Sequence, residues 1–391
     1  MRGPVSIATC FWDFFAQFGK PLRAPDEVPS PSELPETGVI KVVNLHRLAS
    51  NPSRTTVVFI HFHPQEWFAP GFLKLIESAC SSGYRVIVAS NARPSKASDL
   101  RKLGDLAYLQ RANIGYDFGA LRDVRSLLST HGLLEDGRYV VLNSSLLNIA
   151  SAGFGADPVL DRLARQEQDA DLLGITSSYE KVGYHIQSYF YSASGSLFGS
   201  VKFGEWLDAY WRGLGSTKLT PRNYAIQKGE LRFTAWASRS GFKVAALFDH
   251  FHLPTTDLYR QVGSLAEQLL VLLGPSIQAT PLPARPEGPH LLETFRYEWL
   301  PRLGFQTNPT QAWWALLLIN DFCFVKRELL ENGFVRGNSA LTVHALLMPL
   351  LEAVGVKIPP WSDLHSLTEQ IHVARPTLSH SSAHQRKDQK K

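Results

Sequence analysis

Apolar runs alternate with segments of helical spacing along the central part of the chain. The run TTVVFIHFH at 55–63 is rich in β-branched residues, and so is YRVIVASN at 84–91. Between them, GFLKLIESACSSG at 71–83 places its apolar residues at helical spacing and ends in glycine. A strand, a helix and a strand in this order make a βαβ unit, so the pattern predicts a parallel sheet.

The same alternation continues toward the C-terminus. LAYLQ at 106–110 predicts a strand, 120–132 a helix, and RYVVLNSSL at 138–146 another strand. Further strands are expected at 171–178, 188–198 and 242–248, and further helices at 202–213, 231–241, 310–331 and 339–354. The sequence therefore predicts an α/β fold of the Rossmann type, in which helices flank a mostly parallel sheet, followed by a helical C-terminal extension.

The N-terminal part of the chain differs in composition from the rest. SIATCFWDFFAQFGK, near the start, predicts a helix with one apolar face, which either docks onto the protein's own core or lies on a membrane surface. The proline-rich and acidic residues 21–37 predict a linker. The expected division is 1–37 for the amphipathic helix and linker, 38–260 for the α/β domain, 261–372 for the helical extension and 373–391 for a basic disordered tail.

Charge and cysteine content limit the classes of partner and compartment. The formal net charge is +5, and most of it comes from the tail, where the charged residues are Arg375, Arg386, Lys387, Asp388, Lys390 and Lys391. A nearly neutral body argues against nucleic-acid binding. Three cysteines far apart fit no disulfide framework, no run of about 20 apolar residues could span a membrane, and Asp13 interrupts the apolar stretch that a signal peptide would need. We expect a cytoplasmic protein, and its N-terminal helix and tail are candidates for weak contact with the inner face of the cell membrane.

The segment Asn113–Asp123, NIGYDFGALRD, is the first candidate ligand site. It lies between a predicted strand and a predicted helix, and open parallel sheets bind ligands at this kind of turn. Glycines there let backbone amides approach a phosphate or a nucleobase, and a helix N-terminus favours an anion. The alternative is a polar turn in which Asp117 serves as a helix N-cap.

Two later motifs extend this candidate site. VLNSSL ends a predicted strand with the polar triplet Asn143, Ser144 and Ser145, and Glu230 opens the predicted helix at 231–241. This order of motifs resembles family 2 nucleotide-sugar glycosyltransferases of the GT-A fold. The stretches NIGYDFGALRD, VLNSSL, DLLGITSSYEKVGYHIQSYFYSASGSLF and NPTQAWWALLLINDFCFVKRELL more closely resemble the rhamnan synthesis protein F family of bacterial polysaccharide assembly, from about residue 55 to about residue 332.

The resemblance implies transfer of a sugar, such as rhamnose, from a nucleoside diphosphate donor to a glycan or lipid-linked glycan of the cell surface, as in lipopolysaccharide or capsule synthesis. By position, Glu230 would be the catalytic base of an inverting reaction. The alternative for Glu230 is a helix N-terminal glutamate that complements the helix dipole. His185, with Gln187 and Ser188 beside it, would lie close to the sugar or acceptor, and the alternative is a structural histidine.

The resemblance also implies which residues bind the donor. Asn113, Gly115, Asp117 and Arg122 would line the nucleotide pocket, with Asp117 near the base or ribose. Asn143 and Ser145 would meet the donor at the end of their strand, and His61 matches a histidine position of the family. In the C-terminal stretch, Lys326 and Arg327 face either solvent or a diphosphate.

The chain departs from the family pattern at the place where a metal is expected. Glycosyltransferases of this type end the strand with an aspartate that holds Mg²⁺ or Mn²⁺ on the diphosphate, whereas the triplet here has no carboxylate. A metal could be held otherwise, arginines and backbone amides could replace it, or the protein could be an inactive sugar-nucleotide or glycan-binding scaffold. Two other groups, His61 with His63 and Asp249 with His250 and His252, contain metal-ligand types at spacings that are not diagnostic.

Overall fold

The computed structural model describes residues 34–95, 100, 105–148, 156–165, 169–178, 184–249, 310, 317 and 322–327. The N-terminal amphipathic helix, the helix expected at 339–354 and the basic tail lie outside these residues. No helix within the described ranges is both long enough and apolar enough to cross a bilayer.

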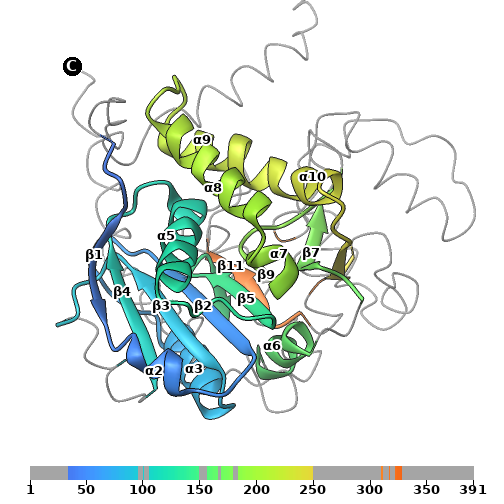
Figure 1. The fold of residues 1–391 in the computed structure, drawn as a ribbon. Helices are drawn as coiled ribbons and strands as arrows, with labels where there is room; N and C mark the ends of the chain where they lie inside the picture. Colours follow the sequence, from blue (N-terminus) through green and yellow to red (C-terminus); the bar gives the residue numbers. More distant parts are fainter. Residues whose placement is uncertain are drawn as a thin grey trace, which may run out of the picture.

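A nine-stranded sheet forms the centre of the described structure (Figure 1). Its order is β1-β4-β3-β2-β5-β9-β7-β10, with β8 paired to β7. The pairs β4–β3, β3–β2, β2–β5 and β7–β10 are parallel, whereas β9 runs antiparallel to both of its neighbours and β1 runs antiparallel to β4. The strands are β1 Val39–Val43, β2 Thr55–His61, β3 Arg85–Ser90, β4 Leu106–Arg111, β5 Arg138–Asn143, β7 Leu172–Ser178, β8 His185–Ile186, β9 Phe190–Ser194 and β10 Val244–Phe248.

Helices cover both faces of the sheet (Figure 1). Alternation along β5 shows why, because Val140 and Leu142 enter one core cluster while Tyr139 and Val141 enter the other. The first cluster includes side chains of α3 (Pro70–Ser81) and α6 (Ala156–Ala164). The second includes side chains of α2 (His46–Ser50), α5 (Tyr116–Thr130), α7 (Gly195–Phe198), α8 (Val201–Leu214), α9 (Pro221–Tyr224) and α10 (Leu231–Arg239). The expected α/β class, a sheet flanked by helices, is confirmed, but the sheet is mixed and not mostly parallel, because four of its strand pairs are parallel and four are antiparallel.

Two predicted elements are wrong in part. The strand expected over 188–198 ends at Ser194, whose hydroxyl accepts a hydrogen bond from the Leu197 amide and begins the short helix α7. The helix expected over 310–331 contains a strand, β11 (Phe324–Lys326), which pairs antiparallel with β6 (Leu146–Asn148). Tertiary pairing thus overrides the helical pattern of this segment.

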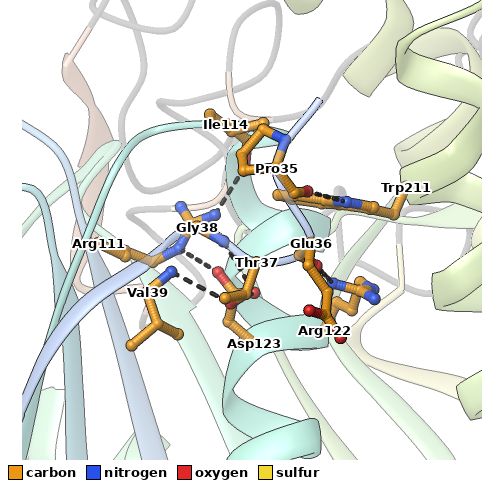
Figure 2. A network of polar contacts seen from close by, with 10 residues as sticks. All are labelled: Pro35, Glu36, Thr37, Gly38, Val39, Arg111, Ile114, Arg122, Asp123 and Trp211. Carbon is orange, nitrogen blue, oxygen red and sulfur yellow. Dashed lines mark hydrogen bonds and ion pairs between the residues drawn. The ribbon is translucent and has the colours of Figure 1, made fainter. Parts of the chain in front are cut away.

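The residues just before β1 are attached to the domain by a polar network (Figure 2). Asp123 on α5 accepts hydrogen bonds from the Thr37 hydroxyl at 2.8 Å and the Gly38 amide at 3.3 Å. The indole of Trp211 on α8 donates to the carbonyl of Pro35 at 3.1 Å. Residues 34–37, which the sequence assigns to the linker, therefore contact α5 and α8, and the domain boundaries remain predictions.

Candidate functional site

The strand order reverses between β2 and β5. From β2 the chain builds outward through β3 and β4, and it then crosses back through α5 to place β5 on the other side of β2. Ligands of open α/β sheets bind outside the carboxyl ends of the strands at such a reversal. Here the two strand ends touch, because the Ser144 amide donates to the carbonyl of Ile60 at 3.0 Å.

The turn between β4 and α5 is shaped by its two glycines. Gly115 has a φ of +72° and Tyr116 one of +51°, so the chain enters α5 through left-handed backbone that glycine adopts readily. A Cβ at Gly119 would lie 2.2 Å from the carbonyl oxygen of Ile114. The Arg111 guanidinium donates to that same oxygen at 2.6 Å and forms a buried ion pair with Asp123 at 3.0 Å. This turn, in which Asn113 is half-buried, is therefore held in one shape.

That shape brings Asp117 to the end of β5. Asp117 lies in the first turn of α5, whose N-cap residue is Gly115, so Asp117 is not the N-cap. Its Oδ2 accepts a hydrogen bond from Asn143 Nδ2 at 2.6 Å, and Asn143 Oδ1 accepts from the Ser145 amide at 3.0 Å and the Ser145 hydroxyl at 2.5 Å. Burial raises the pKa of Asp117, while the Asn143 hydrogen bond and the Arg111 charge act in the other direction. Three of the expected donor-binding residues thus form one network across the strand reversal.

Tyr210 on α8 connects this network with Glu230. Its hydroxyl donates to the carbonyl of Gly115 at 3.0 Å. Burial raises the pKa of Tyr210 well above its usual value, and the charges of Asp117 and Glu230 are among the groups that raise it further. Both carboxylates therefore lie near one phenol, which places Glu230 on the same side of the sheet as Asp117.

Glu230 directly precedes α10, as the sequence suggests, but it is not the first residue of the helical stretch. The helical stretch begins earlier, with Thr220 as N-cap and Pro221 in the first turn, and it passes through a π-helical segment, η1 (Ala225–Glu230), into α10. Gly229 packs so closely that a Cβ there would lie 2.4 Å from the Phe118 ring. Glu230 is therefore half-buried inside a helix and not at a free N-terminus, which removes the helix-dipole alternative. Single π-helical turns within α-helices are frequent at functional sites.

Tyr191 on β9 is a residue that the sequence analysis missed. It lies opposite Val141 of β5, is 1% exposed, and its hydroxyl has no hydrogen-bond partner within the described part of the chain. Burial raises its pKa well above the usual value, and the charge of Asp117 adds to this. A buried polar atom without a partner is costly, so this hydroxyl adds an unsatisfied polar group close to the charge of Asp117.

His185, Gln187 and Ser188 lie at the same edge of the sheet, because β9 begins where the parallel strands end. All three side chains are buried. The His185 and Gln187 side chains approach within 3.4 Å through their Nε2 atoms. The Ile186 amide donates to the Thr234 hydroxyl of α10 at 3.0 Å, so β8 is fixed beneath the helix that follows Glu230.

The His61 side chain is buried at the end of β2. Its Nε2 contacts the Trp67 carbonyl at 3.0 Å, which requires an Nε2–H tautomer, and its Nδ1 lies 2.8 Å from the Ser90 hydroxyl. The ring stacks on Phe68 with centroids 3.9 Å apart. Burial lowers the pKa of His61 to about 3. A neutral imidazole with both nitrogens in use favours a structural role, and the donor-binding role expected for His61 remains a prediction.

Arg122 is likewise engaged in holding the fold together (Figure 2). Its guanidinium pairs with Asp208 at 2.7 Å, donates to the Glu36 carbonyl at 2.7 Å and lies over the Trp211 ring at 4.9 Å. These contacts join α5, α8 and the segment before β1. These contacts support a structural role for Arg122, and its expected role in the nucleotide pocket remains a prediction.

Metal-ligand types do not cluster in the part of the chain that the structure covers. No group of three histidine, cysteine, aspartate or glutamate side chains there could hold an ion. Asp249 accepts a hydrogen bond from the Ser177 hydroxyl at 2.9 Å, and its expected companions His250 and His252 lie outside the described residues.

Known proteins similar to this chain are distant relatives. The uncharacterized protein y4gN of Sinorhizobium fredii is 27% identical over 202 residues, which make up 50% of this chain and 49% of y4gN, so the match spans about half of that relative. The mannosyltransferase PcManGT from Pyrobaculum calidifontis, solved with GDP-Man and Mn²⁺, is 10% identical over 94% of this chain and 93% of its own, with a TM-score of 0.30. A 4-diphosphocytidyl-2C-methyl-D-erythritol synthase is 11% identical over 56% of this chain and 99% of its own, with a TM-score of 0.31. These structural similarities are too low to support an argument.

The sequence itself gives the clearer relationship. A family model described as Rhamnan synthesis protein F matches residues 85–272. This range begins at β3 and includes Asp117, Asn143, Tyr191 and Glu230. The match confirms the resemblance of this chain to the Rhamnan synthesis protein F family.

Proposed function

We propose that this protein is a glycosyltransferase that moves a sugar from a nucleoside diphosphate donor onto a growing cell-surface polysaccharide. The observation that carries the proposal is the Asp117–Asn143 contact of 2.6 Å across the strand reversal, where open α/β sheets bind their ligands. The family match supports polysaccharide synthesis as the setting. The donor sugar in this proposal is rhamnose, because the family is described by rhamnan synthesis.

The proposed roles follow from where the side chains lie. Asn113, Gly115, Asp117, Asn143 and Ser145 bind the donor at the ends of β4 and β5. Glu230 takes the proton of the acceptor hydroxyl as that oxygen attacks the anomeric carbon on the face opposite the leaving diphosphate, so the configuration inverts. His185 lies toward the acceptor.

The partners in this proposal are a nucleotide sugar made in the cytoplasm and a glycan or lipid-linked glycan acceptor. An acceptor of that kind would bring the protein to the inner face of the cell membrane. Contact with the membrane belongs to the N-terminal helix and the basic tail, both outside the described residues.

Substitution of Glu230 by glutamine tests the proposed chemistry. Glutamine keeps the size of the side chain and removes the base, so transfer should fall by about 10²–10⁴-fold while the donor dissociation constant changes by no more than a few-fold. Transfer would be followed as release of the nucleoside diphosphate, and affinity by isothermal titration calorimetry. Glu205→Gln, which removes an exposed carboxylate from α8, is the matched control. Undiminished turnover by Glu230→Gln would remove this residue from the mechanism.

The second candidate is a binding scaffold in a polysaccharide assembly complex. It is favoured by one observation, the strand end Asn143-Ser144-Ser145 without a carboxylate. A scaffold would bind a nucleotide sugar or glycan without release of product at any protein concentration. Release of a nucleoside diphosphate that depends on Glu230 would exclude it.

A further inference from the structure

The polar residues at the end of β5 do not fit a divalent cation. Mg²⁺ and Mn²⁺ take oxygen ligands and are commonly held through carboxylates. Here the Asn143 amide oxygen already accepts two hydrogen bonds from Ser145, and Ser144 Oγ contacts the Phe62 backbone amide at 3.3 Å. The one carboxylate of this network, Asp117, is engaged by Asn143, and its burial favours the uncharged form. These oxygen atoms are therefore engaged in a hydrogen-bonded network and are not arranged as ligands for a cation.

A basic residue from a distant part of the sequence, Arg327, lies next to the polar residues at the end of β5. β11 pairs with β6 so that Lys326 lies opposite Leu146, and the pairing extends one residue further, because the Arg327 amide donates to the carbonyl of Ser145 at 2.9 Å. The backbone of Arg327 is thereby fixed against the last residue of the triplet.

The charge of Arg327 acts on a residue next to the strand reversal. Besides burial, the Arg327 charge is one of the causes that lower the pKa of His61, the last residue of β2. His61 adjoins the ends of β2 and β5, where the Ser144 amide meets Ile60. The neighbouring Lys326 is placed differently, since its ammonium lies over the Tyr189 ring at 5.6 Å. Lys326, the last residue of β11, and Arg327, which follows it, thus have different surroundings.

We propose that Arg327 binds the diphosphate of the donor in place of a divalent cation, so that donor binding does not require a metal. This inference rests on the proposed glycosyl transfer at the same site. A guanidinium suits the task, because its planar fork can bind phosphate oxygens in pairs and it stays charged at all working pH values.

Arg327 acts on the negative charge that the transfer reaction produces. The acceptor oxygen forms a bond to the anomeric carbon, the bond from that carbon to the phosphate oxygen breaks, and its electron pair leaves with the diphosphate. The acceptor proton passes to Glu230. Arg327 stabilises the negative charge that develops on the departing diphosphate.

Calorimetry on the full chain tests the proposal. UDP, GDP and dTDP, with their monophosphates, would be titrated into the wild type in EDTA and in Mg²⁺ or Mn²⁺. For the diphosphate that binds, we expect affinities within about three-fold with and without metal. Arg327→Gln should weaken the diphosphate by at least about ten-fold, the loss expected for a charge-assisted hydrogen bond, and leave the monophosphate nearly unchanged. Arg327→Lys should recover part of the loss, and Arg212→Gln, an exposed control on α8, should bind as the wild type does.

Each other outcome overturns the inference in a distinguishable way. Diphosphate binding that appears only with metal overturns it and leaves the proposed glycosyl transfer standing. Equal weakening of monophosphate and diphosphate by Arg327→Gln assigns Arg327 a structural role. If Arg327→Gln does not fold, the metal dependence of the wild type and the Arg327→Lys affinity still decide the question. Absence of binding by every nucleotide overturns both the inference and the proposed function.

Discussion

Acid stability offers a direct test of the structural role of His61. Its imidazole has a pKa of about 3 in the folded protein against an ordinary value of 6.5, because the ring is buried and both of its nitrogens make hydrogen bonds in the neutral form. Between these values the unfolded chain binds a proton that the folded protein does not. The unfolding free energy therefore falls as the pH falls, and this one group accounts for a loss of about 2 kcal/mol between about pH 8 and about pH 5.

The perturbation is His61→Gln, which cannot take up the proton and keeps a donor for the Trp67 carbonyl. Urea denaturation at a series of pH values would give the unfolding free energies of the wild type, His61→Gln and His131→Gln, an exposed control. We expect His61→Gln to be less stable at pH 8 but to lose about 2 kcal/mol less than the wild type on acidification. Other groups cancel in this difference, including Asp117, whose raised pKa makes the unfolding free energy fall as the pH rises. Parallel curves for all three proteins would refute the reasoning.

Three further substitutions test the turn and the network. Gly119→Ala places a methyl group 2.2 Å from a backbone carbonyl oxygen, so urea denaturation should show a loss of about 1–3 kcal/mol; an unchanged midpoint would contradict this. Asp123→Asn leaves the buried Arg111 without its ion pair and should cost about 3–5 kcal/mol, whereas the double variant Arg111→Met/Asp123→Leu should cost less; equal losses would argue against a pairing effect. Asn143→Asp sets two carboxylates together and should destabilise more at pH 8 than at pH 5, and adding Asp117→Asn should restore the single hydrogen bond and remove this pH dependence; a loss that does not vary with pH would show that the two groups do not interact.

The parts of the fold that the sequence predicts are those with long periodic runs. TTVVFIH and RVIVAS are apolar and β-branched over six or seven residues, so β2 and β3 could be assigned from their pattern alone. β6, β8 and β11 have two or three residues each, too few for any period to show. Such strands exist because a partner strand completes their hydrogen bonds, and the partner is distant in sequence. The antiparallel direction of β9 also depends on packing that no local pattern encodes.

The candidate site was predictable to the extent that its residues lie next to strand ends. Asn143 ends β5, Ser145 lies just beyond it, and Asp117 lies in the first turn of the helix after β4, and the rule for parallel sheets brings such residues to one edge. Tyr191 and Tyr210 lie within a strand and a helix, where an aromatic residue usually signals core packing. Their nearness to Asp117 depends on how β9 pairs with β5 and how α8 packs against α5. Arg122 shows the opposite ambiguity, since an arginine near a glycine-rich turn can bind a ligand or anchor the fold, and the sequence alone does not distinguish the two.

The pairing of β11 with β6 means that one side of the central core is completed late in synthesis. Phe324 packs against Phe190, and Phe322 packs against Phe248, with ring centroids 5.5 and 5.4 Å apart. Residues of this sheet up to Phe248 leave the ribosome well before residue 322 does. Until then, the first core cluster lacks the contacts that Phe322 and Phe324 provide. The strand pairing that provides these contacts also fixes the backbone of Arg327 against Ser145, so completion of this core and placement of the residue proposed to bind the diphosphate occur together.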